Sequence, residues 1–525
     1  DQFSMPEQGR KCSVCGERDV VFFRESMNKK KFTRYDDAVY DLTENANVTM
    51  KFLSDKEGLC SVCFLKRTFE IYLQKKVSTQ FKNYTFPSTA EVATADFRKN
   101  ALQNAAKEFE KLRKTLKKHL KGNLPICNQL PKIEKTFGLS TDFDSQLLYE
   151  ENLTPKYFSK EIGVELDGLA LDEIKSALKT IIDIAGHPSR YYAIVHFDGD
   201  NMGKWLSGEL LPEIEYSYNS RTWKKISEIF LDADGRTKIS FAKYLSELSK
   251  TKILTPAIHA AISTALKNYS LEFVKNIIEE EHLGNLIYAG GDDVLAFVNL
   301  SDLLDVIQKL RWAFSGQIRI DNGRISPDLN HKSGFVEKNN RLLLTMGCHA
   351  SGSIGVVIAH YKMPLQIAIN EVFKAEKIAK ESGKDSFAIC LLRRSGEKRL
   401  AVSSFLIENN DVIEIIKSIA EAFNPENENG FISKSFIYKF TLEFERLKLF
   451  SKELVELEEI FTAELLRLLK RSYVKPKKRI KSENVKNLIE NIWQGMKEIL
   501  CYDITNIENF INLCIIADFL HSRGK

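Results

Sequence analysis

Three aspartates occupy positions from which carboxylates can gather around metal ions. Asp198 directly follows the apolar, β-prone run 191–197, and Asp292 and Asp293 follow a Gly-Gly pair much later in the chain. Phosphoryl transfer from a nucleotide uses two Mg²⁺ ions, which prefer oxygen ligands and so require converging carboxylates. A strand-end Asp beside a hairpin turn with two more Asp meets this requirement. We predict that Asp198, Asp292 and Asp293 are catalytic and bind two Mg²⁺ or Mn²⁺ ions.

The alternative for the segment Gly290-Gly291-Asp292-Asp293 is an ordinary turn, because Gly and Asp are favoured turn residues. A second apolar strand that ends in Asp198, with a helix between the two segments, favours the metal site. For Asp200, two roles stay open: a catalytic one, or support of the turn around the site.

Hydrophobic periodicity indicates the elements that must position these residues. Runs 285–289 and 294–298 flank the Gly-Gly-Asp-Asp segment and predict a β-hairpin. Thr255 and Pro256 predict the start of a helix, and Gly383 the end of another. The polar stretch 317–340 is interpreted as an insertion. This order predicts an α+β domain with its helices on one face of the sheet. The predicted elements are strand 191–197, helix 256–280, the hairpin, helix 302–314, strand 353–360, helix 363–382 and strand 387–392.

A strand-end Asp combined with a Gly-Gly-Asp-Asp hairpin resembles the palm of the large subunit of type III CRISPR RNA-guided effector complexes, most closely the Cmr-type (type III-B) subunit. That family is related to the diguanylate cyclases. Residues 353–362 look like its later palm strand. Residues 379–385 are similar to the Ala-Lys-x-x-Gly-Arg-Asn segment of cyclases, which contacts nucleotide phosphates, with Lys384 where cyclases usually have Arg. The resemblance implies a ferredoxin-like palm of the nucleotidyl cyclase type.

The resemblance also implies which residues contact the nucleotide. These are Gly199, whose carbonyl is a further candidate metal ligand, and Gly290, Gly291, Ser353, Lys380 and Lys384. Glycines permit a positive φ and a close approach of phosphates to the backbone. For the two lysines, the alternative is a solvated helix end, where cations are favourable without any ligand.

The activity that the resemblance implies is that of a nucleotidyltransferase, a cyclic oligoadenylate synthase. Such an enzyme joins ATP molecules 3′ to 5′, releases pyrophosphate, and becomes active when its complex captures target RNA. The implied partners are the other protein subunits, the guide RNA and the target RNA. Two alternatives stay open. A diguanylate-type cyclase would use GTP, but no Glu-Phe follows the hairpin pair. A catalytically silent RNA-binding scaffold subunit would not need the three intact aspartates.

Two cysteine pairs predict a structural zinc site. Cys12-Ser13-Val14-Cys15 and Cys60-Ser61-Val62-Cys63 each provide two thiolates from one tight turn, and four thiolates complete a tetrahedral Zn²⁺ site with no open position. The alternative is four unrelated thiols. A similar zinc module precedes the palm in the resembling family.

Composition limits the class of protein. The chain has 525 residues and nine cysteines, an odd number that argues against a disulfide framework and favours a reducing, cytoplasmic setting. No run approaches the ~18 apolar residues of a membrane span. The net charge is only +5, so any RNA-binding surface must be local. Candidate basic clusters, each also explicable as a solvated surface, are 29–34, 475–481 and the group Lys111, Arg113, Lys114, Lys117, Lys118 and Lys121.

We predict four domains: a zinc module (1–66), a helical domain (67–185), the palm (186–400) and a C-terminal helical domain (401–525). The helical parts include helix 95–120 with Thr94 as N-cap, and helices 435–470, 482–500 and 507–521. Members of the resembling family commonly carry an HD nuclease domain and a first palm before the zinc region. This sequence contains no His-Asp dipeptide and begins at Asp1, so we expect no HD nuclease here. We also expect either a longer natural protein or a partner that supplies the second ATP site.

Overall fold

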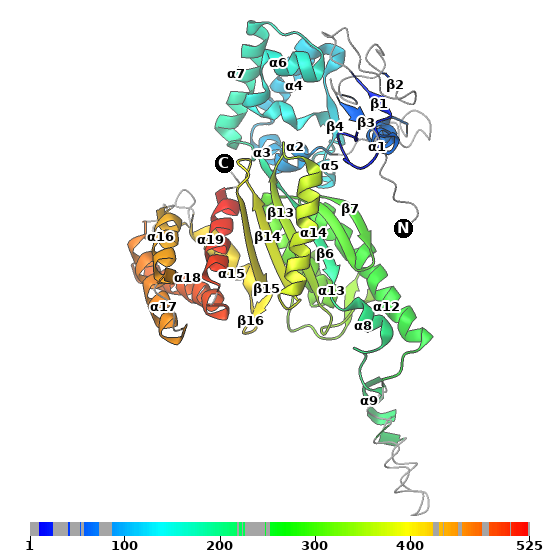
Figure 1. Cartoon of the computed structure of the whole chain (residues 1–525), viewed down its shortest axis with the longest axis vertical. Helices are drawn as coiled ribbons and strands as arrows, with labels where there is room; N and C mark the ends of the chain where they lie inside the picture. Colours follow the sequence, from blue (N-terminus) through cyan, green and yellow to red (C-terminus); the bar gives the residue numbers. More distant parts are fainter. Residues whose placement is uncertain are drawn as a thin grey trace, which may run out of the picture. The chain divides into compact units, whose positions relative to one another are not determined.

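The computed structural model consists of two compact units, 1–188 and 189–525, which are described separately (Figure 1). The finer division into four domains stays a prediction. The described residues are 10–24, 40–41, 53, 57–72, 87–217, 220–222, 224–225, 247, 252–423, 430–433, 435–449, 454–474, 482–504 and 506–522. The predicted basic clusters 29–34 and 475–481 lie outside them. Among the described residues, no helix combines the length and apolar character needed to cross a bilayer.

The first unit begins with a small sheet of order β2-β1-β3 followed by helix α1. Its helical part packs α4 against α7, with Phe109, Leu112 and Leu178 in the shared core. The elements are β1 Phe22–Phe23, β2 Tyr40–Asp41, β3 Gly58–Leu59, α1 Ser61–Tyr72, α2 Thr89–Ala93, α3 Ala95–Asn104, α4 Ala106–Leu120, η3 Lys121–Asn123, β4 Ile126–Asn128, α5 Pro131–Phe137, β5 Thr141–Phe143, η4 Ser145–Leu148, η5 Glu150–Asn152, α6 Pro155–Tyr157, η6 Phe158–Ile162 and α7 Gly168–Ala185.

Two predictions for this unit were wrong. The expected helix 95–120 is two helices, because Ala105 leaves the helical region at φ −135°. Thr94 does not cap the first of them through its side chain, since its hydroxyl donates back to the carbonyl of Ala90 at 2.9 Å.

Within the predicted basic group on α4, Arg113 turns inward to the buried carboxylate of Asp142, with Nη2 2.9 Å from Oδ2. The lysines of that group are exposed.

The second unit contains a six-stranded mixed sheet of order β15-β14-β13-β6-β8-β7. Only the β13–β14 pair is parallel. The strands are β6 Tyr191–Gly199, β7 Gly284–Gly290, β8 Asp293–Asn299, β13 Gly352–His360, β14 Ser386–Leu392 and β15 Lys398–Ser404. The strands that the sequence predicted are all present. The edge strand β15 was not predicted, because its run 398–404 mixes charged and hydroxyl residues with few apolar ones.

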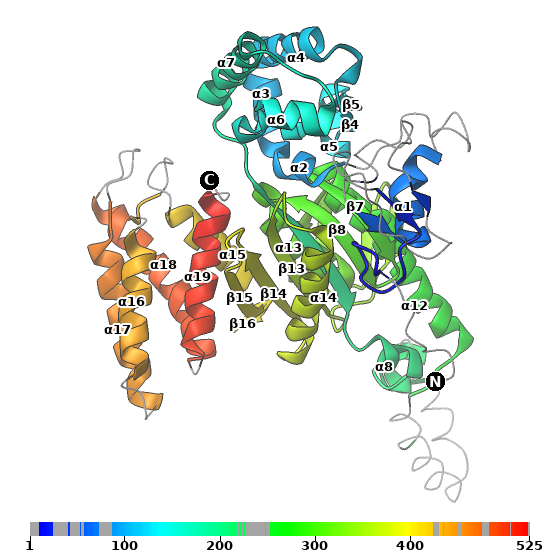
Figure 2. The same cartoon turned by 45° about the horizontal axis from the view of Figure 1, so that its top comes forward.

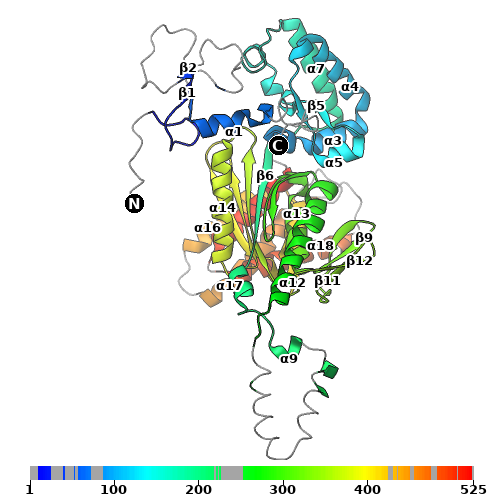
Figure 3. The ribbon, with the colours of Figure 1, turned by 90° about the vertical axis from the view of Figure 1, so that its right-hand side faces the viewer.

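Helices cover both faces of this sheet, so the prediction of helices on one face was wrong. Side chains alternate along a strand, and neighbouring residues of β6 contact different helices. Phe197 packs on Phe314 of α13 (Leu303–Ser315), with ring centroids 5.2 Å apart, whereas His196 contacts Phe373 of α14 (Leu365–Glu381) at 4.6 Å. Figure 3 shows β6 between these two helices. The main hydrophobic core of this unit lies on the face of the sheet that α13 covers.

The predicted helix 256–280 begins as expected at α12 (Pro256–Asn268), where Thr255 accepts from the N–H of Ile258 at 3.3 Å. It then continues as the wider turns η7 Tyr269–Val274 and η8 Asn276–Glu281. The polar insertion is not a plain loop. It contains two hairpins, β9 Ile318–Asp321 with β10 Arg324–Pro327, and β11 Phe335–Lys338 with β12 Arg341–Leu344. Short helices α8 Met202–Ser207 and α9 Ile214–Ser217 follow β6, and η9 Leu300–Asp302 precedes α13.

The C-terminal helices pack beside β15 and continue the core of the sheet (Figure 2). They are α15 Val412–Ala422, α16 Ser435–Leu449, α17 Leu454–Arg471, α18 Ser482–Tyr502 and α19 Ile507–Ser522, after the small pair β16 Leu406–Ile407 and β17 Asn410–Asp411. The predicted helix 435–470 is therefore two helices. On α19, Asn509 bonds both the N–H and the carbonyl of Val402, and Asn512 donates to the carbonyl of Leu400 at 3.0 Å. Side chains thus pair with the edge of β15.

Candidate functional site

Two of the predicted aspartates lie opposite each other on neighbouring strands. Asp198 on β6 is in register with Asp293 on β8, and on its other side with Ser353 on β13. Side chains in register point to the same face of a sheet, here the face that α14 covers. Asp292 stands in the turn just before β8, where its carbonyl accepts from the N–H of Gly199 at 3.2 Å. The structure therefore brings all three aspartates to one end of the sheet.

Helix α14 comes close to these strands because Gly355 has no side chain. A Cβ at Gly355 would lie 2.3 Å from the backbone nitrogen of Glu376. Glu376 and Lys380, one helical turn apart, consequently lie over the end of β6. The Lys380 ammonium forms ion pairs with Oδ2 of Asp198 and, at 3.0 Å, with Oε1 of Glu376. Burial lowers the pKa of Lys380, but the two ion pairs outweigh it and the net pKa is raised.

His196 is a site residue that the sequence reasoning missed. Its Nε2 lies 2.9 Å from Oδ1 of Asp293, and the ring is 6% exposed and packed on Phe373. A carboxylate can only accept, so Nε2 carries the proton. The signal was available, since His196 stands two residues before Asp198 and therefore points to the same face.

The three carboxylates have the chemistry of a divalent-metal site. Burial raises the pKa of Asp292, and the negative charges of Asp198 and Asp293 raise it further. Such mutual repulsion is relieved by a cation, and the donors are the carboxylate oxygens that Mg²⁺ prefers. Their ligand atoms do not all lie within 4.8 Å of one another among the described residues. Instead, Lys380 and His196 each hold one carboxylate.

Asp200, whose role the sequence left open, supports the structure around the site. It is 1% exposed and its carboxylate accepts from the hydroxyls of Ser351 at 2.7 Å and Ser353 at 2.8 Å. It also accepts from the N–H of Asp385 at 2.9 Å. Ser353 is fully buried and its hydroxyl donates to Asp200. This geometry does not support the prediction that Ser353 contacts the nucleotide.

Lys384 lies beside the same strand end in an uncommon backbone conformation. Its φ is +65°, and its ammonium donates to Oδ1 of Asn201, three residues after Asp198. Asp385, at φ +46°, pairs with Arg311 of α13, whose Nη2 lies 2.9 Å from Oδ2. Of the two lysines that the sequence singled out, Lys380 is therefore paired with Asp198 at the end of β6, and Lys384 with Asn201 just after it.

The predicted glycines differ in what requires them. Gly291 has φ +70°, so the hairpin turn needs it. Gly290 does not have a positive φ, but a Cβ there would lie 2.0 Å from the Tyr288 hydroxyl. At Gly199 a Cβ would lie 2.9 Å from Cβ of Asp292. Gly199 and Gly290 are thus required by close packing, and Gly291 by the conformation of the turn.

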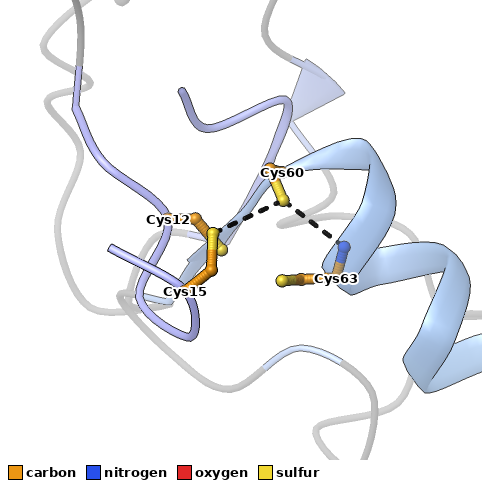
Figure 4. Close-up of side chains that lie close together, drawn as sticks. All are labelled: Cys12, Cys15, Cys60 and Cys63. Carbon is orange, nitrogen blue, oxygen red and sulfur yellow. Dashed lines mark hydrogen bonds between the residues drawn. The ribbon is translucent and has the colours of Figure 1, made fainter. Parts of the chain in front are cut away.

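The four predicted cysteines form one cluster. The sulfurs of Cys12, Cys15, Cys60 and Cys63 all lie within 4.8 Å of one another, and Figure 4 shows them converging from the turn after Arg10 and the start of α1. Cys15 Sγ and Cys60 Sγ are 3.9 Å apart, close to the ~3.8 Å edge of a tetrahedron with Zn–S bonds of about 2.3 Å. Backbone N–H groups of Arg18 and Glu17 lower the pKa of Cys15 to about 6, which favours its thiolate. The donor set fits zinc.

Comparison with known proteins identifies the sheet domain. Residues 191–388 match the family model described as Cas10/Cmr2, second palm domain. This segment belongs to the Cas10/Cmr2 palm family. The second palm domain accounts for β6 to β14, the strands and turns that carry the three aspartates and Lys384.

Comparison with whole proteins shows similarity to Cmr2 proteins over most of the chain. The CRISPR system Cmr subunit Cmr2 of Pyrococcus furiosus is 28% identical over 510 residues, covering 95% of this chain and 47% of that protein. A type III-B Cmr-beta structure in the apo state matches with TM-score 0.56 at 18% identity, covering 94% of this chain and 58% of its own. A Cmr-beta structure bound to cognate target RNA matches with TM-score 0.54, also at 18% identity, covering 93% of this chain and 57% of its own. The chain thus spans about half the length of these relatives.

Proposed function

We propose that this palm transfers nucleotidyl groups from ATP and forms cyclic oligoadenylate, as part of a type III-B RNA-guided effector complex. The observation that carries the proposal is the placement of Asp198 opposite Asp293, with Asp292 in the adjoining turn. The strand order β13-β6-β8-β7, with helices between β6 and β7 and between β8 and β13, supports a ferredoxin-like palm of the cyclase type.

In this proposal Asp198, Asp292 and Asp293 hold two Mg²⁺ or Mn²⁺ ions. Such ions, when bound, lower the pKa of the attacking 3′ hydroxyl and neutralise the leaving pyrophosphate. His196 fixes the rotamer of Asp293, so that one of its oxygens stays available to a metal. Burial and, after it, the charges of Asp198 and Asp293 raise the pKa of Asp292, and a bound metal would relieve the repulsion between these charges.

Lys380 and Lys384 then bind phosphates. The Lys380 ammonium pairs with Asp198, and the Lys384 ammonium donates to Asn201. A bound triphosphate would compete for both ammonium groups, because its oxygens form charge-assisted hydrogen bonds with lysine. The metals would then take the place of the Lys380 ammonium on the carboxylate of Asp198. In this proposal Lys380 exchanges Asp198, and Lys384 exchanges Asn201, for the phosphates of the substrate.

The same ion pair favours a second candidate function, a silent scaffold subunit. Lys380 on Asp198 and His196 on Asp293 occupy carboxylate oxygens, and the three aspartates are not gathered within 4.8 Å. A palm that never binds metal would look the same. Activity is therefore the deciding measurement.

The partners of this chain are proposed by analogy with its structural relatives. The structures named above are Cmr-beta complexes, one of them bound to cognate target RNA. We accordingly propose other Cmr-type protein subunits, guide RNA and target RNA as partners of this chain, with zinc as the structural ion of its cysteine cluster.

The test is incubation with Mn²⁺ or Mg²⁺ and labelled ATP or GTP, with products identified by mass spectrometry. It is run on the chain alone and on the chain reconstituted with its complex and target RNA. The proposal expects cyclic oligoadenylate that disappears in the double variant Asp292→Ala/Asp293→Ala. A product from GTP only would replace the proposal with the diguanylate-type alternative. No turnover in the complete RNA-bound complex would establish the scaffold reading.

A further inference from the structure

The carboxylate of Asp200 lies two residues beyond Asp198 and yet faces away from solvent. Within the described residues, its carboxylate accepts hydrogen bonds from protein groups. The Ser353 hydroxyl donates to Oδ1, and the Ser351 hydroxyl and the Asp385 N–H donate to Oδ2. Its own N–H donates to the carbonyl of Ser351 at 2.9 Å. Both carboxylate oxygens of Asp200 are engaged, and the residue is only 1% exposed, so a metal ion could not reach it.

The segment that Asp200 holds has three successive positive φ values. Gly383 is at +113°, Lys384 at +65° and Asp385 at +46°. Residues with a Cβ adopt this region rarely and at an energetic cost, so their surroundings must impose it. Two contacts do so here: the Asp385 N–H on Asp200, and the Asp385 carboxylate on the guanidinium of Arg311, which is itself 3% exposed.

The consequence of this backbone path is the position of one ammonium group. With the path fixed, Lys384 reaches Oδ1 of Asn201 on the turn after β6. Asp200 and Asn201 are neighbours, so one short turn anchors both the backbone and the side chain of this loop.

We infer that Asp200 is a positioning residue for nucleotide phosphates, acting through Asp385 and Lys384, and that it is not a ligand of the catalytic metals. This inference rests on the proposed function and deepens it, since it assigns to the loop 383–385 the recognition of the triphosphate of a nucleoside triphosphate. Arg311, on the opposite face of the sheet, completes the same support through Asp385.

Asp200→Asn tests the inference because it keeps the size of the side chain and changes its hydrogen bonding. The amide can keep its oxygen toward Ser351 and the Asp385 N–H and turn its NH2 to the Ser353 hydroxyl, which can accept, so the variant keeps these contacts and loses the charge that strengthens them. Two constants are measured on the full chain: the Kd of Mn²⁺ without nucleotide, by electron paramagnetic resonance, and the Kd of a non-hydrolysable ATP analogue, by calorimetry. We expect the analogue to bind about tenfold more weakly, the equivalent of one charge-assisted hydrogen bond, with Mn²⁺ affinity unchanged.

A double-mutant comparison separates positioning from general damage. If Asp200 acts through Lys384, Asp200→Asn has no further effect on analogue binding in a Lys384→Met background. Asp142→Asn is the matched control, since Asp142 is another buried carboxylate that binds arginines and a backbone N–H, in the other unit. It should lower thermal stability and leave analogue binding unchanged. Ser353→Ala, which removes a single bond to Asp200, replaces Asp200→Asn if that variant does not fold.

Four results would overturn the inference. Weaker Mn²⁺ binding in Asp200→Asn, matching that of Asp293→Asn, would make Asp200 a metal ligand. Equal analogue binding by Asp200→Asn and the unmodified chain would remove its positioning role and leave the proposed function intact. Additive losses in the double variant would exclude action through Lys384. An unmodified chain that does not bind the analogue at all would overturn the proposed function together with this inference.

Discussion

His196 Nε2 lies 2.9 Å from Oδ1 of Asp293, so a buried ring of β6 contacts a predicted metal ligand on β8. The ring is held in turn by Phe373 of α14. The carboxylate of Asp293 is 44% exposed, so this bond is its restraint on one side while the other side faces solvent.

Replacing His196 should therefore weaken metal binding without removing a ligand. We expect His196→Ala to lower Mn²⁺ affinity or catalytic rate by about 10–100-fold, the usual cost of losing a partner behind a metal ligand. His196→Gln, which can still donate to Asp293, should recover part of the loss. His259→Ala, at an exposed histidine of α12, is the control. Unchanged Mn²⁺ titration of His196→Ala would show that the bond has no such role.

Asp292 should change the stability of the protein in opposite directions with and without metal. Its pKa is raised by burial and by the charges of Asp198 and Asp293, so the folded chain holds its proton more tightly than the unfolded chain. Without metal, ionisation of Asp292 therefore lowers the free energy of unfolding as the pH rises from about 3.8 through the raised pKa of this carboxyl. Asp292→Asn should be more stable than the unmodified chain at neutral pH in EDTA, by a few tenths to about 1 kcal/mol after solvent screening.

Excess Mg²⁺ or Mn²⁺ should reverse that order, because only the unmodified chain gains binding energy from the metal. Thermal unfolding of both proteins between pH 4 and 8, with EDTA and with Mn²⁺, measures both effects. An Asp292→Asn variant that is less stable in EDTA at every pH would contradict the repulsion inferred from its surroundings.

Lys380 should oppose metal binding and favour nucleotide binding. Its ammonium is paired with Asp198, so a metal that binds this carboxylate must displace it. We expect Lys380→Met to bind Mn²⁺ more tightly without nucleotide and the ATP analogue more weakly, each by severalfold. Lys377→Met, at a 75% exposed lysine of the same helix, is the matched control. If both affinities moved in the same direction, the exchange of partners proposed for Lys380 would be wrong.

The cysteine cluster should hold one zinc ion per chain and stabilise the first unit. Cys12 and Cys60 are almost fully buried, so Cys60→Ala loses both a ligand and packing. We expect loss of zinc by elemental analysis and a lower melting temperature, reproduced in the unmodified protein by a strong chelator. Cys348→Ser, outside the cluster, should change neither. A chain purified with full zinc content after Cys60→Ala would place the ion elsewhere.

Local patterns were sufficient to predict the strands and the turn that carry the aspartates. Short continuous apolar runs mark β6 and β8, and Gly291 marks the turn between β7 and β8 because that position needs φ +70°. The cysteine cluster was predictable for a similar reason, since two short repeats with metal-ligand spacing require little knowledge of the fold. Whether its residues bind zinc is a matter for the measurement above.

Contacts between distant segments could not be predicted in this way. Arg311 and Asp385 are far apart in sequence and meet only because α13 and the loop after α14 reach the same sheet end. The burial of Ser353 follows from its pairing with Asp200, which no local pattern encodes. The helices on both faces were missed because β6 is apolar at nearly every position, so its sequence does not show which face is covered.

The asparagines of α19 have a consequence for how another protein can approach this sheet. At one margin, Asn509 and Asn512 occupy main-chain groups of Val402 and Leu400; at the other, the N–H of Leu286 on β7 donates to Glu279 at 3.1 Å. Groups that would start the addition of a foreign strand are thus already engaged at both margins. Addition of a foreign strand is therefore disfavoured at these positions, where contact with another protein would rest on side chains and not on backbone pairing.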